Sequence, residues 1–281
     1  MLADIYEPWF WRMLAAALLS AWLCALVGVP LYLRRRSMVA DALAHTALPG
    51  IVLAYLVSAQ LGGWVLVGGV ALTGWVTVLL VDRLSARRGV RSDAAIGVAF
   101  TGLFALGVVL VSTLGRDAHL SLSCLLFGDM MGVRDASFLL MGSALLLALG
   151  GYVLGGAGFC LALFDPLGAR VMGLPTRAYD QGWMVLTAVA IAASFEAVGV
   201  VLVLALVVLP AATAHQHATS WAGLILAALG WSTLATLAGV VLALWWDVST
   251  AGMVVCVALL LYALPKPWSQ PVVNAADAVL G

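Results

Sequence analysis

Long apolar stretches alternate along the chain with short clusters of charged residues, glycine and proline. The apolar stretches of roughly spanning length lie at residues 9–33, 39–58, 64–81, 94–114, 136–158, 183–198, 199–215, 221–244 and 250–264. A transmembrane helix needs about 17–25 residues, and its backbone must satisfy its own hydrogen bonds in lipid. The pattern therefore predicts an all-α polytopic membrane protein. The sixth and seventh stretches are short and contiguous, so the sequence allows eight or nine crossings.

Composition supports a membrane protein and narrows its class. Of the 281 residues, 64% are hydrophobic and 9% are charged, whereas about a quarter of a soluble domain is charged. We expect a single transmembrane domain over residues 1–281, and no cleavable signal peptide, because the first apolar stretch is long enough to span. The formal net charge is zero, and we expect no nucleic-acid partner.

The distribution of arginine predicts the orientation in the membrane. If Arg34–Arg36 are cytoplasmic and the stretches alternate, the basic residues at 83–91, 170–177 and 266 also fall inside. That excess is the positive-inside pattern. It predicts a multi-pass membrane protein with its N-terminus outside and its C-terminus inside.

The lysine content excludes one way of using ATP. Lys266 is the one lysine, and Pro267 follows it, so the chain contains no GK[ST] phosphate-binding motif. If ATP drives this protein, a separate chain must hydrolyse it.

Asp41 and His45 are the first candidate site. Their i, i+4 spacing places both side chains on one helix face, and a carboxylate within a membrane segment costs about 2.5–3.5 kcal/mol unless it faces a polar path or a partner. Carboxylate and imidazole together suit manganese, zinc or iron. The alternative is structural: Asp41 pairs with the Arg34–Arg36 cluster, and His45 only packs. Pro49 favours the metal site, because a break there would free the carbonyl of His45.

Two further acidic residues are candidates for the permeation pathway. Glu196 lies within an otherwise uncharged apolar run, and an intramembrane carboxylate is a functional candidate by default. Its structural alternative is a helix-end carboxylate at a turn near Gly199. Asp247 follows Trp246, where an outer loop or a helix cap is favoured over a gate.

The segment "FDPLGARVMGLPTR" (164–177) predicts a short cytoplasmic helix over about residues 164–175. Asp165 is a good N-cap, Pro166 suits the first turn, and Gly173 with Pro175 ends the helix. Its apolar stripe of Leu167, Val171 and Leu174 either lies on the bilayer or docks into a groove on a soluble partner.

Six motifs, in this order, resemble the permease subunits of zinc, manganese and iron ABC importers. They are "RRRSMVADALAHTALPG", "RSDAAIGVAFTGLFALGVVLVS", "LLFGDMMGV", "FDPLGARVMGLP", "EAVGVVLVLALVVLPAATA" and "DVSTAG", and the resemblance covers most of the chain. In "DVSTAG", relatives often have proline before Ser or Thr.

The resemblance implies a fold, partners and site residues. It implies two permease copies or close paralogues, cytoplasmic ATP-binding subunits and an extracytoplasmic metal-binding protein. Asp41 and His45 would be the metal site, and Glu196 would match a membrane glutamate of the family. The helix with Asp165, Pro166, Leu167, Arg170, Val171 and Gly173 would couple to the ATPase.

The expected function is thus a non-enzymatic permease that transports Mn²⁺ or Zn²⁺, and possibly iron, as substrate, with no permanently bound cofactor. The alternative is a gradient-driven metal carrier that needs no ATPase, which would not depend on Asp165 or Arg170. An intramembrane enzyme is disfavoured, because the chain has no HExxH and no GxSxG motif.

Overall fold

The computed structural model describes residues 8–58, 63–86, 91–114 and 135–264, and every regular element in these ranges is an α-helix. The all-helical fold predicted from the apolar pattern is therefore confirmed. The helices are α1 (Pro8–Leu33), α2 (Ser37–Ser58), α3 (Gly63–Ser85), α4 (Ser92–Leu114), α6 (Asp135–Phe164), α7 (Pro166–Val171), α8 (Thr176–Val198), α9 (Val200–His217), α10 (Trp221–Trp246) and α11 (Thr250–Ala263).

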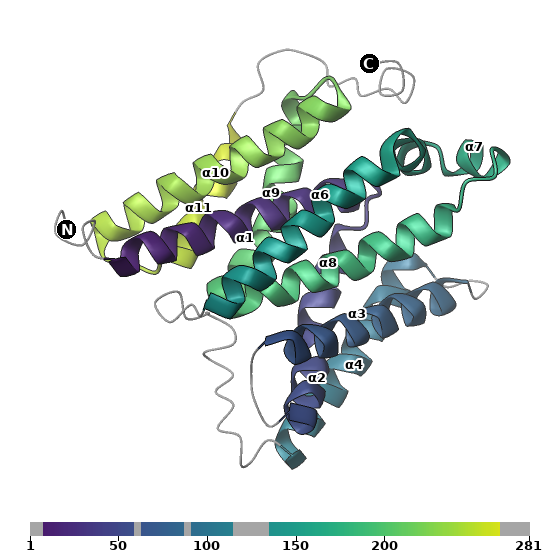
Figure 1. Cartoon of the computed structure of the whole chain (residues 1–281), viewed down its shortest axis with the longest axis horizontal. Coiled ribbons are helices and arrows are strands. Elements are labelled where there is room, and N and C mark those ends of the chain that lie inside the picture. The colour runs from purple at the N-terminus through teal and green to yellow at the C-terminus, as the bar shows by residue number, and fades with distance from the viewer. Residues whose placement is uncertain (1–7, 59–62, 87–90, 115–134, 265–281) are drawn as a thin grey trace.

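Most of these helices can cross a bilayer. Within the described residues, 7 are long and apolar enough to do so: α1, α2, α3, α4, α6, α9 and α10. Helix α8 has 23 residues, which is long enough for a crossing. The apolar helix α11 has 14 residues, about three fewer than the usual minimum of roughly 17. The short α7 links α6 to α8 at one end of the molecule (Figure 1).

The helices form three groups (Figure 1). Helices α1, α6 and α8 contact one another at the centre. Helices α2, α3 and α4 pack together on one side and reach the centre mainly through α3 and α8. Helices α9, α10 and α11 form the other group and reach the centre mainly through α1. The fully buried side chains accordingly concentrate where α1, α2, α8 and α9 meet.

Gly199 separates two helices that the apolar pattern runs together. Its φ of 77° and ψ of 163° end α8 and begin α9, a conformation that favours glycine. The sixth and seventh apolar stretches are therefore two helices that meet at Gly199.

Pro30 lies inside α1 and leaves a backbone acceptor free. A proline at position 30 has no N–H to donate to the carbonyl of Leu26, four residues earlier. The hydroxyl of Tyr152, on α6, donates to that carbonyl at 2.7 Å. One residue further on, the indole N–H of Trp183, on α8, donates to the carbonyl of Val27 at 3.2 Å. The three central helices are therefore joined by hydrogen bonds as well as by packing.

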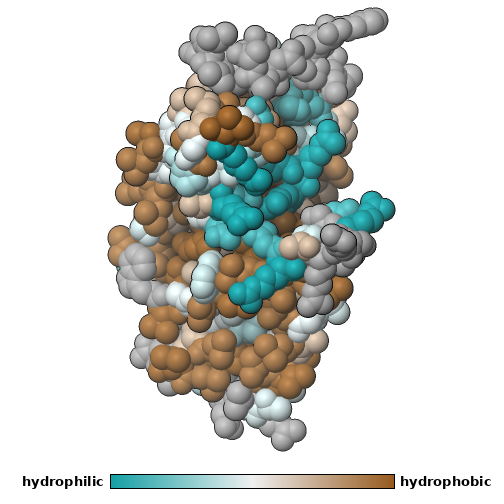
Figure 2. All heavy atoms as spheres, turned by 90° about the vertical axis from the view of Figure 1, so that its right-hand side faces the viewer, coloured by the Kyte–Doolittle hydropathy of each residue, from teal (hydrophilic) through white to brown (hydrophobic). Residues whose placement is uncertain are grey.

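The end of the molecule that carries α7 differs in its surface from the flanks. Figure 2 shows hydrophilic side chains gathered in one band across this end, with apolar side chains beside and below the band. Exposed arginines at this end include Arg35 and Arg177, next to the helix ends at Leu33 and Thr176.

Candidate functional site

Helix α2 carries Asp41 and His45 on one face. The Nε2 atom of His45 lies 3.6 Å from Oδ1 of Asp41, and the side chains are 32% and 59% exposed, respectively. Both donor atoms are thus close enough to share one ion, and neither is sealed inside the chain. This placement follows from one helical turn between positions i and i+4.

Two phenylalanines of α4 flank the imidazole. The ring centroid of His45 lies 5.2 Å from that of Phe100 and 5.7 Å from that of Phe104. The two phenylalanine rings stack at 6.0 Å. The aromatic rings restrict the rotation of His45 while Asp41 stays open, so an ion could approach from the exposed side.

Helix α2 is not broken at Pro49, and the sequence-based expectation of a break there is wrong. The helix runs on to Ser58. Close packing on two sides supports it: a methyl group on Gly107 of α4 would lie 2.8 Å from Cδ of Pro49. A methyl group on Gly50 would lie 2.7 Å from the carbonyl oxygen of Gly69 on α3. Neighbouring helices therefore hold α2 straight enough to continue, although Pro49 still has no N–H for the carbonyl of His45.

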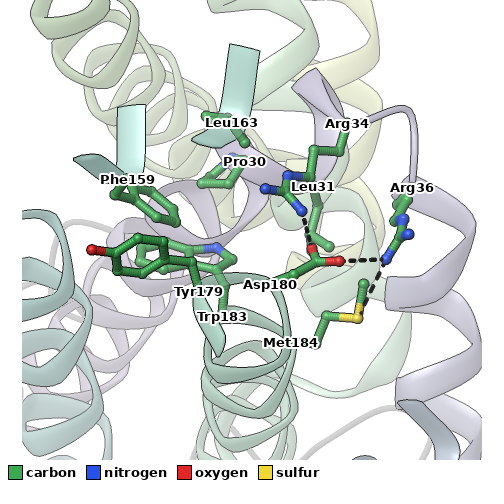
Figure 3. Close-up of a pocket in the computed structure, with 10 residues that line it drawn as sticks. All are labelled: Pro30, Leu31, Arg34, Arg36, Phe159, Leu163, Tyr179, Asp180, Trp183 and Met184. Atoms are coloured by element: carbon green, nitrogen blue, oxygen red, sulfur yellow. Dashed lines mark hydrogen bonds and ion pairs between the residues drawn. The ribbon is translucent and has the colours of Figure 1, made fainter. Parts of the chain in front are cut away.

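The Arg34–Arg36 cluster does not pair with Asp41. Both Arg34 and Arg36 instead pair with Asp180 of α8, Arg36 at 3.0 Å (Figure 3). The structural alternative, in which Asp41 pairs with these arginines, is therefore not supported. The contact that the structure gives the Asp41 carboxylate is the imidazole one turn along its own helix.

The described part of the chain contains no group of three or more His, Cys, Asp or Glu side chains placed to share a metal ion. Asp41 and His45 are thus a two-donor set within one chain. Glu196 belongs to the last turn of α8, three residues before Gly199, and its side chain lies outside the described residues. Asp247 caps the C-terminus of α10 in the left-handed conformation, with φ 52° and ψ 48°, which is the cap role that the sequence favoured.

The helix predicted over about residues 164–175 is present as α7, but it is shorter than expected. Asp165 is its N-cap and accepts a hydrogen bond from the backbone N–H of Gly168 at 2.9 Å. Pro166 is the first helical residue, and Gly173, with φ 76°, follows the C-cap. Arg170 donates from Nε to the hydroxyl of Thr176 at 3.1 Å, which closes the loop onto α8.

The exposed apolar surface of α7 differs from the predicted stripe. Leu167 and Val171 are exposed as expected, and Met172 is exposed beside them. Leu174 lies beyond the end of the helix and packs near Gly158 of α6. The exposed apolar surface at α7 therefore consists of Leu167, Val171 and Met172.

Sequence reasoning missed three residues of this region. Asp180 received no role, although it is the nearest carboxylate before a long apolar run. Phe100 and Phe104 looked like ordinary apolar positions of a membrane helix. A pattern within one segment cannot reveal contacts between α2 and α4 or between residues 34 and 180.

Comparison with known proteins places the chain among transporters. The family model described as "ABC 3 transport family" matches residues 6–265. The chain is 34% identical over 270 residues to the manganese transport system membrane protein MntD of Bacillus subtilis (strain 168), covering 92% of this chain and 90% of the relative. It is 33% identical over 252 residues to the zinc transport system membrane protein TroD of Treponema pallidum (strain Nichols), covering 86% of this chain and 69% of that protein.

A solved structure shares the fold. PsaBC from Streptococcus pneumoniae, in complex with Fab, superposes with a TM-score of 0.81 at 23% identity, covering 93% of this chain and 94% of that one. The family match and the relatives confirm the resemblance that the six motifs indicated. The chain belongs to the ABC 3 transport family.

Proposed function

We propose that this chain is the membrane permease of an ATP-driven importer whose substrate is a divalent first-row metal ion: manganese, zinc or iron. The chain is the permease and not the ATPase, since its family is one of ABC transport proteins and its sequence contains no GK[ST] motif. The observation that carries the metal substrate is the Asp41–His45 pair. A carboxylate and an imidazole 3.6 Å apart on a membrane helix are donors that suit these ions.

Two donors do not complete a coordination sphere, and this supports pairing with a second permease. Zinc in proteins usually takes four ligands. The Asp41 carboxylate is 59% exposed, so its coordinating oxygens are accessible to another chain. A second copy, or a close paralogue, that presented the same pair would bring the set to two carboxylates and two imidazoles.

The helix α7 is the proposed contact with a cytoplasmic ATP-binding subunit. Its exposed Leu167, Val171 and Met172 form a small apolar surface of the kind that docks into a groove. Asp165 fixes the first turn of this short helix through its cap. Arg170 fixes the return to α8.

The membrane arrangement follows from the arginines. The chain is a multi-pass membrane protein with spanning helices, and we infer that the α7 end faces the cytoplasm because arginines gather there. With α8 and the short α11 counted as crossings as well, the N-terminus lies outside and the C-terminus inside, and a metal-binding protein delivers the ion at the opposite, extracytoplasmic face. We assign the chain to the bacterial cytoplasmic membrane, as one permease domain over residues 1–281, with Glu196 as a further polar group near the path at the α8–α9 break.

Uptake into vesicles tests this function. The chain would be reconstituted with its ATP-binding subunit and its metal-binding protein, and uptake of radioactive Mn²⁺ and Zn²⁺ would be measured with and without ATP. We expect ATP-dependent uptake that Asp41→Ala and His45→Ala abolish while the complex stays intact. Asp93→Ala, which removes an exposed carboxylate from the first turn of α4, is the matched control and should transport normally.

One result would overturn the proposal. Uptake that is driven by a proton gradient without ATP, and is indifferent to Asp165→Ala, would make the chain a self-sufficient carrier.

A further inference from the structure

The turn between α1 and α2 is short and internally fixed. Residues 34–36 alone connect the two helices. The backbone N–H of Arg36 donates to the carbonyl of Leu31 at 2.9 Å, and Arg35 adopts a left-handed φ of 55°. A turn this short and hydrogen-bonded is stiff, so a displacement of its side chains also displaces Ser37, the first residue of α2.

Both oxygens of the Asp180 carboxylate are engaged by this turn (Figure 3). Arg34 pairs with Oδ1, and Arg36 donates to Oδ2 at 3.0 Å. The side chains of Arg34 and Asp180 are only 16% and 22% exposed, whereas that of Arg36 is 35% exposed. A pair this enclosed is hard to break one partner at a time, because the remaining charge would be left with little solvent.

Arg34 also holds the other side of the α7 loop. Its second guanidinium nitrogen donates to the carbonyl of Ala162 at 3.0 Å. Ala162 lies in the last turn of α6, and Asp180 lies in the second turn of α8. Because α7 joins these two helices, Arg34 contacts the helices on both sides of α7, at the end of α6 and near the start of α8.

Two aromatic side chains lie beside the ion pairs that Asp180 makes with the two arginines. Phe159 of α6 and Trp183 of α8 line the same pocket as Pro30, Arg34 and Asp180 (Figure 3). The rings of Phe159 and Trp183 lie 4.9 Å apart. The ion pairs of Asp180 with the two arginines therefore lie beside packed aromatic side chains of α6 and α8.

We propose that Asp180 is a positioning residue that couples movement of α7 to α2 through Arg34 and Arg36. A displacement of α7 by the partner ATPase would be passed through this cluster to the start of α2, and so to Asp41 and His45 one to two turns further on. This inference rests on the proposed function, since it assigns the route by which ATP hydrolysis alters the metal-bearing helix.

The test compares transport with ATP hydrolysis in the reconstituted complex. The variants are Asp180→Asn, Arg36→Gln, both together, and Asp180→Glu, with Arg83→Gln as the control that removes an exposed arginine from the last turn of α3. The readout is the number of Mn²⁺ ions taken up per ATP hydrolysed, together with the amount of intact complex. A purely structural ion pair would lower the amount of complex but leave that ratio unchanged.

We expect Asp180→Asn to lower the ratio about tenfold or more, within the 5- to 150-fold range of typical coupling between sites. Arg36→Gln should lower it less, because Arg34 still holds the carboxylate. The double variant should be no worse than Asp180→Asn alone, since the residues act as one unit. Asp180→Glu should restore part of the ratio, and Arg83→Gln should match the wild type.

An unchanged ratio in Asp180→Asn would overturn the coupling role. If Asp180→Asn does not assemble, an unchanged ratio in the assembled Arg36→Gln complex would overturn it equally. A wild-type complex that transports Mn²⁺ without ATP would instead refute the proposed function, and would be seen before any variant was compared.

Discussion

The hydroxyl of Tyr152 should contribute measurably to stability, because it donates to a carbonyl whose usual helical donor is missing. Pro30 removes the N–H that would otherwise bond to the Leu26 carbonyl, and Tyr152 fills that place at 2.7 Å. Tyr152→Phe deletes the donor but keeps the ring, which lies 4.8 Å from that of Trp183 and 6.1 Å from that of Phe159.

The size of the effect follows from the surroundings. A buried acceptor left without a partner costs about 1–3 kcal/mol, whereas hydrogen bonds between membrane helices average about 0.6 kcal/mol with a maximum near 1.7. Pro30 has no N–H that could replace the lost hydroxyl, so we expect a loss of about 1–1.5 kcal/mol, toward the upper end of the membrane range.

The assay is reversible unfolding in mixed micelles with increasing dodecyl sulfate, followed by tryptophan fluorescence. The decisive step is to repeat Tyr152→Phe in a Pro30→Ala background. Alanine supplies the missing N–H to Leu26, so the cost of losing the hydroxyl should fall to a few tenths of a kcal/mol there, as for partners in one network. Tyr179→Phe removes a neighbouring hydroxyl that points away from the other labelled side chains (Figure 3), and it should change stability by less than about 0.5 kcal/mol. An equal cost in both backgrounds would show that the Tyr152 hydroxyl does not replace the N–H that Pro30 lacks.

Two other substitutions have expected outcomes. Gly28→Ala would place its methyl carbon 1.9 Å from the carbonyl oxygen of Val207, so α1 and α9 would have to separate, and we expect a loss of about 1–3 kcal/mol in the same unfolding assay. The control is Gly68→Ala, whose methyl group would meet nothing within 4 Å. Equal losses in the two variants would contradict the role of close packing. Asp165→Ala removes the hydrogen bond that the Gly168 N–H donates to the N-cap, worth about 0.5–2 kcal/mol to the helix, and should lower Mn²⁺ uptake per ATP. Asp165→Asn keeps the N-cap and should retain uptake. Equal uptake in the wild type and both variants would argue against α7 as the coupling element.

Much of the fold can be predicted from the sequence, because a long run of apolar residues is enough to predict a membrane helix. Helices α1, α2 and α10 begin and end within about two residues of their apolar stretches. Helices α3 and α6 run four and six residues past the predicted ends, and α8 departs most, since it begins at Thr176 and not near Trp183 as predicted. Its first turns contain Arg177 and Asp180, polar residues that ended the apolar pattern but belong to the helix. Asp180 is held there by arginines that lie more than 140 positions away.

The candidate site was predictable only as far as it is local. The one-turn spacing of Asp41 and His45 fixes their common face, and the structure gives 3.6 Å between their donor atoms. The same reasoning failed at Pro49, where the helix continues because glycines let α3 and α4 pack closely around it. It also could not show that Arg34 serves Asp180, because no periodicity encodes which helices become neighbours.

Equilibrium binding of radioactive Mn²⁺ to the purified, nucleotide-free transporter is the most direct test of the central claim, that Asp41 and His45 hold the transported ion. The binding-protein subunit would be left out so that its own metal is not counted. We expect one Mn²⁺ per two permease chains in the wild type and in Asp93→Ala, and loss of that ion in Asp41→Asn and in His45→Gln while the complex stays intact. Undiminished binding in both variants would show that the ion binds elsewhere.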